Sequence, residues 1–293
     1  METLNTSICF GILYPGDMGQ AIAKELLLHN YKVITASEGR SESTKKRISE
    51  IGITDVKAVK NVVEQADYIL NLTNAASSVA IAQLVAKEIE FTKRKPIYVD
   101  LNSNNPKTAL QIKACFDEVD SHFINAAVLG IPNNVKETAK IIVSGKNTEA
   151  LIHHLSVALQ VKNVGEDIES ASAFKLLFAM VNKAICGLFF ETMLAASHYG
   201  FLEELNDELQ DFLPGTYQDL IKTSTTYPKH IKRRIPEMTE LQEMLEAENL
   251  EAIFAKSTKR ILKIVDESGI MEGKNPKTVR EVFSYFNEIK PKE

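Results

Sequence analysis

The sequence has few cysteines and few histidines. Its three cysteines, Cys9, Cys115 and Cys186, are far apart, and no C-x-x-C pair occurs. This spacing argues against a disulfide framework or a zinc site and fits a reducing compartment. The six histidines offer one adjacent pair, His153 and His154. Neighbouring side chains on a helix point about 100° apart, so this pair does not chelate. We therefore predict no metal centre.

The sequence also lacks an excess of positive charge and an uninterrupted apolar segment. It has 34 Lys and Arg against 39 Asp and Glu, a net charge of −5, which argues against a nucleic-acid partner. The most apolar stretch, residues 174–197, contains Lys175, Lys183 and Glu191, which a membrane span would tolerate poorly. No basic and apolar targeting segment opens the sequence. We therefore expect a soluble, cytoplasmic protein with no membrane partner.

The order of secondary-structure signals predicts two domains. Strand-like and helix-like segments alternate in the first half, which predicts βαβ units and a mostly parallel sheet. Expected strands lie at 8–13, 32–36, 68–72, 96–100, 123–128 and 139–144, with helices between them. After Gly165 only helical periodicity remains. The prediction is an α/β fold, with a Rossmann-like coenzyme domain over 1–164 and an all-α domain for substrate binding and dimerisation over 165–293.

A glycine-containing turn follows the first expected strand. A Rossmann unit places its G-x-G-x-x-G turn here, so that the backbone and a helix N-terminus approach a pyrophosphate closely. Gly16 and Gly19 occupy the second and third glycine positions, while Tyr14 occupies the first. An ordinary strand–turn–helix is the alternative. The predicted coenzyme-binding residues of this turn are Tyr14, Pro15, Gly16, Asp17, Met18 and Gly19.

Residues after the second expected strand bear on the choice of coenzyme. An acidic residue there favours NAD through the ribose 2′-hydroxyl, and an arginine favours NADP through the 2′-phosphate. Both Glu38 and Arg40 are present, and Ser37 and Ser41 add hydroxyl donors. We predict NADP, bound by Ser37, Arg40 and Ser41, with NAD as the less favoured alternative.

Several motifs occur in an order that resembles a known family. They are Gly16-x-Met18-Gly19, Asn102-Ser103-x-x-Pro106 and the segment 125–130. In this order they resemble the β-hydroxyacid dehydrogenase superfamily, which includes 6-phosphogluconate and 3-hydroxyisobutyrate dehydrogenases. The pattern His230-x-x-Arg233-Arg234 resembles a little-characterised branch with a phosphogluconate-dehydrogenase-like helical C-terminal domain. The resemblance covers about residues 6–265.

The resemblance implies roles for residues that follow the expected strands. Leu72, Thr73 and Asn74 would border the coenzyme. Asn102 and Ser103 would lie near the nicotinamide and the substrate. Leu129 and Gly130 would contact the substrate, although Leu129 stands where the family has a serine, so one hydrogen-bond donor is lost.

The resemblance also assigns the catalytic general acid or base to Lys175. In a partly dry cleft the pKa of a lysine falls, so the side chain can exchange a proton with a hydroxyl. The alternative is a lysine that extends from an apolar helix to the surface. The superfamily's asparagine four residues later is Ala179 here. Asn182 and Lys183, further along the same helix, are predicted to contact the substrate.

A cationic cluster in the second half predicts an anionic ligand. His230, Arg233 and Arg234 could hold a small anionic organic substrate, in part from the second subunit of a homodimer. The alternative is an ion-pair network with Glu237 and Glu240 at helical spacing.

The prediction for function is an NADP-dependent oxidoreductase. It would move a hydride between nicotinamide and a small hydroxy acid or its keto form. One alternative is an imine reductase of the same fold. The other is a non-catalytic NADP-binding regulatory protein.

Overall fold

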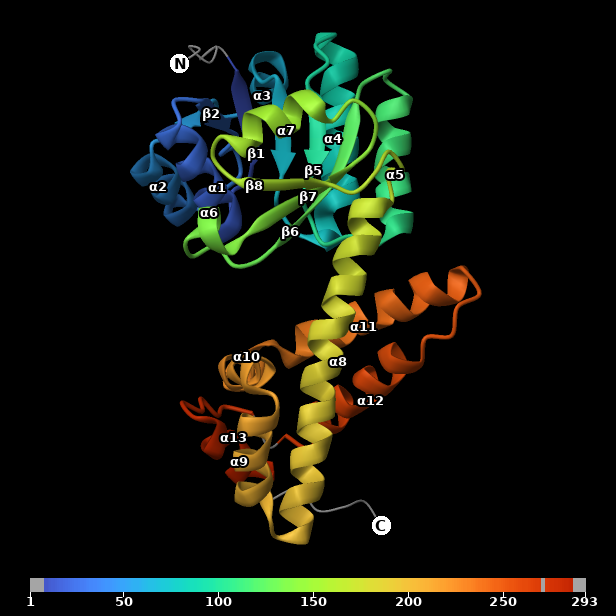
Figure 1. Cartoon of the computed structure of the whole chain (residues 1–293). Helices are drawn as coiled ribbons and strands as arrows, with labels where there is room; N and C mark the ends of the chain where they lie inside the picture. The colour runs from blue at the N-terminus through green and yellow to red at the C-terminus, as the bar shows by residue number, and fades with distance from the viewer. Residues whose placement is uncertain (1–7, 270–271, 287–293) are drawn as a thin grey trace. The chain divides into compact units, whose positions relative to one another are not determined.

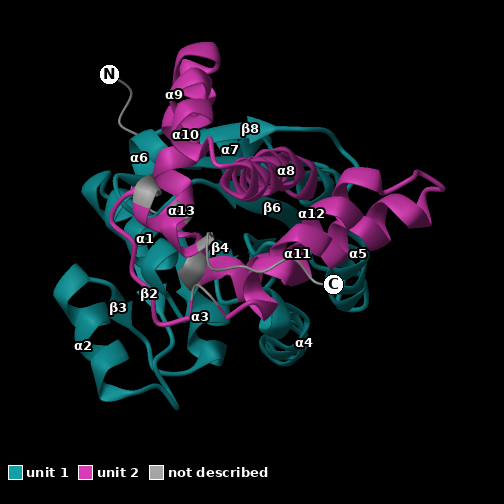
Figure 2. Ribbon diagram, turned by 90° about the horizontal axis from the view of Figure 1, so that it is seen from below, with its two compact units in different colours: residues 1–175 teal, residues 176–293 magenta. Residues whose placement is uncertain are grey.

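The structure is a computed structural model that describes residues 8–269 and 272–286. The chain divides into two compact units, Met1–Lys175 and Leu176–Glu293 (Figure 2). The sequence-based boundary after residue 164 coincides with the end of the last strand. The units divide later, inside a long helix, because its first turn bonds to strands of unit 1.

Unit 1 contains an eight-stranded sheet with the order β3-β2-β1-β4-β5-β6-β7-β8 (Figure 1). Neighbouring strands are parallel except β6 and β7, which are antiparallel. The strands are β1 (Cys9–Leu13), β2 (Lys32–Thr35), β3 (Thr54–Asp55), β4 (Tyr68–Asn71), β5 (Ile97–Asp100), β6 (Phe123–Leu129), β7 (Lys140–Ser144) and β8 (Gln160–Asn163). The expected α/β class and mostly parallel sheet are confirmed. The short strands β3 and β8 were not predicted, because neither contains an apolar run.

Helices cover both faces of this sheet. They are α1 (Asp17–Leu28), α2 (Glu42–Ile51), α3 (Val59–Gln65), α4 (Ala75–Thr92), α5 (Pro106–Asp117), α6 (Val135–Thr138) and α7 (Glu149–Ser156). Alternate residues of β1 belong to different cores: Phe10 and Ile12 pack with α1 and α7, whereas Cys9 and Leu13 pack with α3, α4 and α5. This alternation of side chains along a strand, with both faces covered, explains the continuous apolar run of β1.

The register of the parallel strands brings polar residues to one edge of the sheet. Asn71 of β4 pairs with Leu13 of β1 and Asp100 of β5, and Asp100 pairs with Asn125 of β6. The strand order reverses between β1 and β4. Open α/β sheets bind ligands in the crevice at such a reversal, beyond the carboxyl ends of the strands.

The described part of unit 2 consists of helices and the segments that connect them, with no strand, as predicted. Its helices are α8 (Ser170–Tyr199), which begins in unit 1, then α9 (Leu202–Phe212), α10 (Pro214–Ser224), α11 (Tyr227–Ala247), α12 (Ile253–Glu267) and α13 (Val279–Phe286). Phe190 and Met193 of α8 pack in the buried core with Met238 and Leu241 of α11. Among the described helices, α8 is the one whose length and composition would also allow a membrane span. The core helix of a soluble protein can meet the same criteria, so this finding is weak support for a span.

Candidate active site

The turn between β1 and α1 has the geometry that a nucleotide-binding turn needs. Tyr14, at the first glycine position of the motif, has a φ of 49°, in the left-handed region that glycine adopts at least cost. Gly16 is the N-cap of α1 and gives that helix no side-chain cap, so its first N–H groups are left for a ligand. Gly19 is buried, and a Cβ there would lie 3.1 Å from the Pro15 Cβ. Asp17 is exposed and Met18 packs partly against the core.

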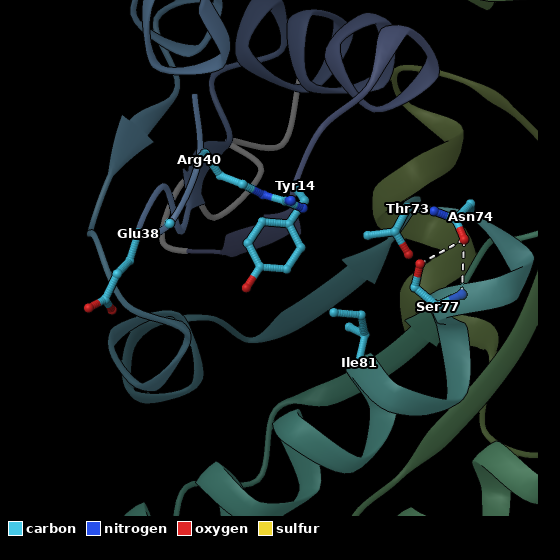
Figure 3. A pocket seen from close by; sticks show the side chains of 8 residues that line it. Tyr14, Glu38, Arg40, Thr73, Asn74, Ser77 and Ile81 are labelled. Atoms are coloured by element: carbon cyan, nitrogen blue, oxygen red, sulfur yellow. Dashed lines mark hydrogen bonds between the residues drawn. The ribbon is translucent and has the colours of Figure 1, made fainter. Parts of the chain in front are cut away.

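An open pocket of about 350 Å³ lies beside this turn (Figure 3). Its residues come from the segments after β1, β2 and β4: Tyr14, Glu38, Gly39, Arg40, Thr73, Asn74, Ser77 and Ile81. The pocket therefore brings together four of the residues predicted to bind the coenzyme, Tyr14, Arg40, Thr73 and Asn74.

Two residues of α4 in this pocket, Ser77 and Ile81, were not predicted. Asn74 caps α4, because its Oδ1 accepts hydrogen bonds from the Ser77 backbone N at 2.9 Å and from Ser77 Oγ at 2.7 Å. The cap fixes the start of α4, and Ile81 follows Ser77 one turn later on the same face. An asparagine immediately before a helical pattern is the signal that could have located them.

Arg40 and Glu38 occupy this pocket differently. The Arg40 Cζ lies 3.7 Å from the centroid of the Tyr14 ring, a cation–π contact. In Figure 3 the Glu38 carboxylate points away from Tyr14. The two predicted serines do not line the pocket. Ser37 is buried and donates to Asp55 Oδ2 at 2.6 Å, whereas Ser41 caps α2 by accepting from the Thr44 backbone N.

A buried carboxylate, Asp100, lies at the end of β5. It accepts hydrogen bonds from Asn71 Nδ2 at 2.9 Å, from Asn104 Nδ2 at 3.0 Å, and from the backbone N and Nδ2 of Asn102 at 2.9 and 3.1 Å. Burial raises the pKa of Asp100 to about 6, although the four hydrogen bonds act in the opposite direction. Asn102 is thus buried and engaged, while Ser103 is exposed.

Asn71, Asp100 and Asn104 were not predicted as site residues. The available signal was a polar residue at the end of an apolar strand, which occurs at both Asn71 and Asp100. Leu72, which was predicted to border the coenzyme, is buried in the core instead.

Lys175 lies against the end of β6. Its Nζ donates a hydrogen bond to the Val128 backbone O at 2.6 Å. Leu129 and Gly130 follow directly, so the lysine and the predicted substrate segment are brought together within unit 1. Gly130 has a φ of 131°, and a Cβ there would lie 2.3 Å from the Thr138 O, so no other residue fits.

Further hydrogen bonds hold the start of α8 and the residue Ile168 before it to the sheet. Asn125 Nδ2 donates to the Ile168 O at 2.7 Å and to Ser172 Oγ at 2.9 Å. Ser144 Oγ accepts from the Ala171 backbone N at 2.9 Å. These bonds fix the first turn of α8, and Lys175 extends from the turn that follows.

The cationic cluster of unit 2 does not form one patch. His230 and Arg233 are exposed, as is Asn182 of α8. The Arg234 Cζ lies 3.7 Å from the Tyr227 ring centroid, and within the described residues its buried Nη1 has no hydrogen-bond partner.

Glu237 pairs with α8 and not with the neighbouring arginines. Lys183 Nζ lies 2.6 Å from Glu237 Oε2, and both side chains are mostly buried. The pKa of Glu240 on the same helix is raised by burial and by the nearby Glu237 and Glu243. Glu237 therefore pairs with Lys183 in place of the predicted arginines, a contact that sequence spacing along α11 alone could not indicate.

Comparison with known families agrees with this geometry. Residues 10–161, about half of the chain, match the NAD binding domain of 6-phosphogluconate dehydrogenase. The chain belongs to the 6-phosphogluconate dehydrogenase-like family. Residues 196–265 match a domain of unknown function, DUF1932. The family assignment confirms an NAD(P)-binding domain in unit 1 and the predicted resemblance.

Individual relatives match most of the length of this chain. A Methanothermus fervidus protein, described as an uncharacterized 28.5 kDa protein in the 7S RNA 5′ region, is 28% identical over 80% of this chain and 90% of its own length. A conserved protein of unknown function, reported as structurally similar to 3-hydroxyacid dehydrogenases, is 24% identical with a TM-score of 0.73. That match covers 90% of this chain and 99% of the other.

Two groups of enzymes share the fold at lower identity. The 3-hydroxyisobutyrate dehydrogenase of Mycobacterium tuberculosis with L-serine is 12% identical, with a TM-score of 0.73 over 95% of this chain and 98% of its own. An imine reductase from Myxococcus stipitatus in complex with NADP+ is 19% identical, with a TM-score of 0.57 over 95% and 99%. At these identities the likeness shows the fold alone.

Proposed function

We propose that this family member is an NADP-dependent oxidoreductase that acts on a small hydroxy acid or its keto form. The observation that carries the proposal is the position of Lys175, whose Nζ bonds to the Val128 O beside the Leu129–Gly130 segment. The same unit contains the coenzyme pocket at the reversal of strand order. Bound nicotinamide would supply hydride chemistry, and the chain would supply position, charge and a proton path.

The preference for NADP is supported by the two charged residues of the pocket. Arg40 lies over Tyr14, and its planar guanidinium can bind a 2′-phosphate through two parallel hydrogen bonds. Glu38, whose carboxylate would accept a hydrogen bond from a ribose 2′-hydroxyl, points away from Tyr14 in Figure 3. The uncapped N-terminus of α1 at Gly16 fits the pyrophosphate.

Lys175 would hold or release the proton of the substrate hydroxyl. The Val128 carbonyl fixes the position of its Nζ, so the ammonium can donate to an oxygen placed next to Leu129 and Gly130. The backbone N–H groups of that segment would bind the substrate in place of the family's serine.

A homodimer is part of the proposal. Along α8 the residues Phe178, Val181, Ile185 and Leu188 are all exposed and alternate at spacings of three and four. This spacing gives one continuous apolar stripe, the pattern by which two helices pack side by side. We propose a cytoplasmic homodimer with no nucleic-acid partner, and sedimentation equilibrium tests the assembly.

The decisive experiment is a titration of the purified protein with NADPH and with NADH, followed by turnover. We expect nicotinamide fluorescence to show tighter binding of NADPH, and oxidation of NADPH by one member of a panel of short keto acids. Failure to bind either coenzyme would overturn the proposal.

An imine reductase is the second candidate. Leu129 removes the donor that would hold a substrate carboxylate, and Ala179 stands where the wider family has an asparagine. The imine reductase from Myxococcus stipitatus shares the fold. Activity on cyclic imines without activity on any keto acid would favour this candidate. Coenzyme binding without turnover on either panel would favour a regulatory NADP-binding protein.

A further inference from the structure

A chain of hydrogen bonds connects the coenzyme pocket with the interior of unit 1. Thr73, which lines the pocket, donates from Oγ1 to Asn71 Oδ1 at 3.0 Å. Asn71 in turn donates from Nδ2 to Asp100 Oδ2 at 2.9 Å. Asn71 and Asp100 are completely buried, whereas Thr73 is partly exposed. The pocket hydroxyl is therefore tied, through one amide, to a buried carboxylate.

The charge of Asp100 determines the direction of every bond in this chain. An ionised carboxylate has no proton, so it can only accept. Asn71 must then turn its NH₂ group toward Asp100 and its carbonyl toward Thr73. The single hydroxyl proton of Thr73 is committed to that carbonyl, so the Thr73 oxygen offers only lone pairs to the pocket.

We propose that Asp100 is a positioning residue that acts through Asn71 to make Thr73 a hydrogen-bond acceptor in the coenzyme pocket. At this position the pocket would take a hydroxyl or amino group of the coenzyme and reject a phosphate oxygen. The inference rests on the proposed coenzyme binding and adds how one contact in that pocket is specified.

Protonation of Asp100 reverses the direction of the hydrogen bonds that join Asp100, Asn71 and Thr73. A protonated Oδ2 donates to Asn71, the amide turns over, and its NH₂ group then donates to Thr73. The Thr73 hydroxyl then turns its O–H toward the pocket. There it meets a hydrogen-bond donor of the coenzyme, with which it cannot pair. Because burial raises the pKa of Asp100 to about 6, both states are accessible in a purified protein between pH 5 and pH 8.

Of the three residues joined by these hydrogen bonds, Asp100 is the one that changes its protonation state between pH 5 and pH 8. Its bonded partners from β4 and from the segment after β5 are the neutral amides Asn71, Asn102 and Asn104. Ser78 of α4 reaches it only through Asn104. Tyr98 of β5 is the titratable side chain that interacts with it, and burial raises the pKa of that phenol well above its usual value. In the described residues no cation lies within hydrogen-bond distance of the carboxylate.

The test is the pH dependence of coenzyme binding, measured by nicotinamide fluorescence from pH 5 to pH 8 with NADH and with NADPH. We expect the affinity of the wild type to fall about five- to tenfold below pH 6, the effect of one mispaired hydrogen bond. Asp100→Asn and Thr73→Val should bind more weakly at pH 7.5 by a similar factor and lose the pH dependence. Thr73→Ser restores the hydroxyl and should restore the pH dependence.

The controls separate this contact from other titrations. The 2′-phosphate of NADPH itself titrates near pH 6. Its contribution would persist in Asp100→Asn and is absent with NADH. Asp67→Asn changes a carboxylate that accepts from the Cys9 backbone N at 2.8 Å, just before the start of β4. This variant should keep the wild-type pH dependence.

Four results would overturn the inference. A wild type whose NADH affinity is independent of pH would do so, as would Asp100→Asn with an unchanged profile, and both leave the proposed function intact. A wild type that binds neither coenzyme overturns the inference and the proposed function together. If Asp100→Asn does not fold, Thr73→Val decides, and an unchanged pH profile in that variant overturns the inference.

Discussion

The two units of this protein hold their buried charges in different ways. In unit 1 the Asp100 carboxylate is surrounded by neutral amides, and four hydrogen bonds stabilise it without a counter-ion. In unit 2 Lys183 and Glu237 form an ion pair between α8 and α11, and Arg234 stacks on Tyr227. A charge without a counter-ion keeps an accessible proton equilibrium, whereas a paired charge is fixed. The Asp100 carboxylate can therefore change its charge with pH, whereas the Lys183–Glu237 pair holds α8 and α11 together.

The largest expected effect is on kcat, and it distinguishes Lys175 from Lys183, two lysines of α8. Lys175→Met should lower kcat about 10²- to 10⁴-fold, because it removes the proposed proton donor. Coenzyme affinity should change little, since Lys175 bonds to the end of β6 and is not among the residues that line the pocket. Steady-state kinetics and fluorescence titration measure the two quantities.

Lys183→Met is the matched control for this prediction. It removes a lysine of α8 whose partner is Glu237, so it should affect the turnover rate much less. Equal losses of kcat in the two variants would contradict a special role for Lys175.

The second prediction concerns the pH dependence of stability. Burial raises the pKa of Asp100 from 3.8 to about 6, so the folded state retains this proton when the unfolded state has lost it. Stability from this group is fully present below pH 3.8 and is lost as the pH rises through 6. The loss is about 3 kcal/mol, to order of magnitude.

Urea unfolding between pH 4 and pH 7 tests this second prediction. The free energy of unfolding of the wild type, taken relative to Asp100→Asn, should decrease over that range. The difference between wild type and Asp100→Asn cancels the pH-dependent contributions of other groups. Glu240, whose pKa is also raised by burial, is one of them. A constant difference between wild type and variant would show that Asp100 does not titrate in this range.

The third prediction concerns the choice of coenzyme in unit 1. Arg40→Ala should weaken NADPH binding about 10- to 100-fold, the effect of losing hydrogen bonds from a charged group. NADH binding should remain nearly unchanged. Arg40→Lys keeps the charge without the planar pair of donors and should give an intermediate NADPH affinity. An equal loss for both coenzymes would mean that Arg40 contacts a part that they share.

The smallest expected effect is the loss of stability on removing the Lys183–Glu237 ion pair of unit 2. Lys183→Met should lower the free energy of unfolding by about 1–2 kcal/mol, because a mostly buried Glu237 loses its partner. The double variant Lys183→Met with Glu237→Leu should recover much of that loss, since no isolated charge remains. Thermal unfolding followed by circular dichroism measures both. A single variant as stable as the wild type would place this pair among the ion pairs that contribute little.

Local patterns were sufficient to predict most of unit 1. The apolar strands and the helix with Pro106 near its start follow from side-chain periodicity and chain geometry, which act over a few residues. The glycine-containing turn was found for the same reason. The strands β3 and β8 were missed, because their residues are paired by the neighbouring strand and not by any apolar run of their own.

The contacts of the candidate site depend on longer distances along the chain. Asn71 meets Asp100 across 29 residues through strand register, and Lys175 meets Val128 across 47 residues through the docking of α8 on the sheet. Likewise, spacing along α11 pairs Glu237 with arginines, whereas packing against α8 pairs it with Lys183.

The sequence by itself determined the order of elements and the turn of the NAD(P)-binding domain, because propensity, periodicity and motif spacing are local properties. Only the tertiary structure decided which polar groups meet. It turned Arg40 toward Tyr14, enclosed Asp100 among three amides, and set Lys175 against the end of β6. The physical reason is that burial and hydrogen-bond direction arise when distant segments pack, and neither is encoded in a short stretch of sequence.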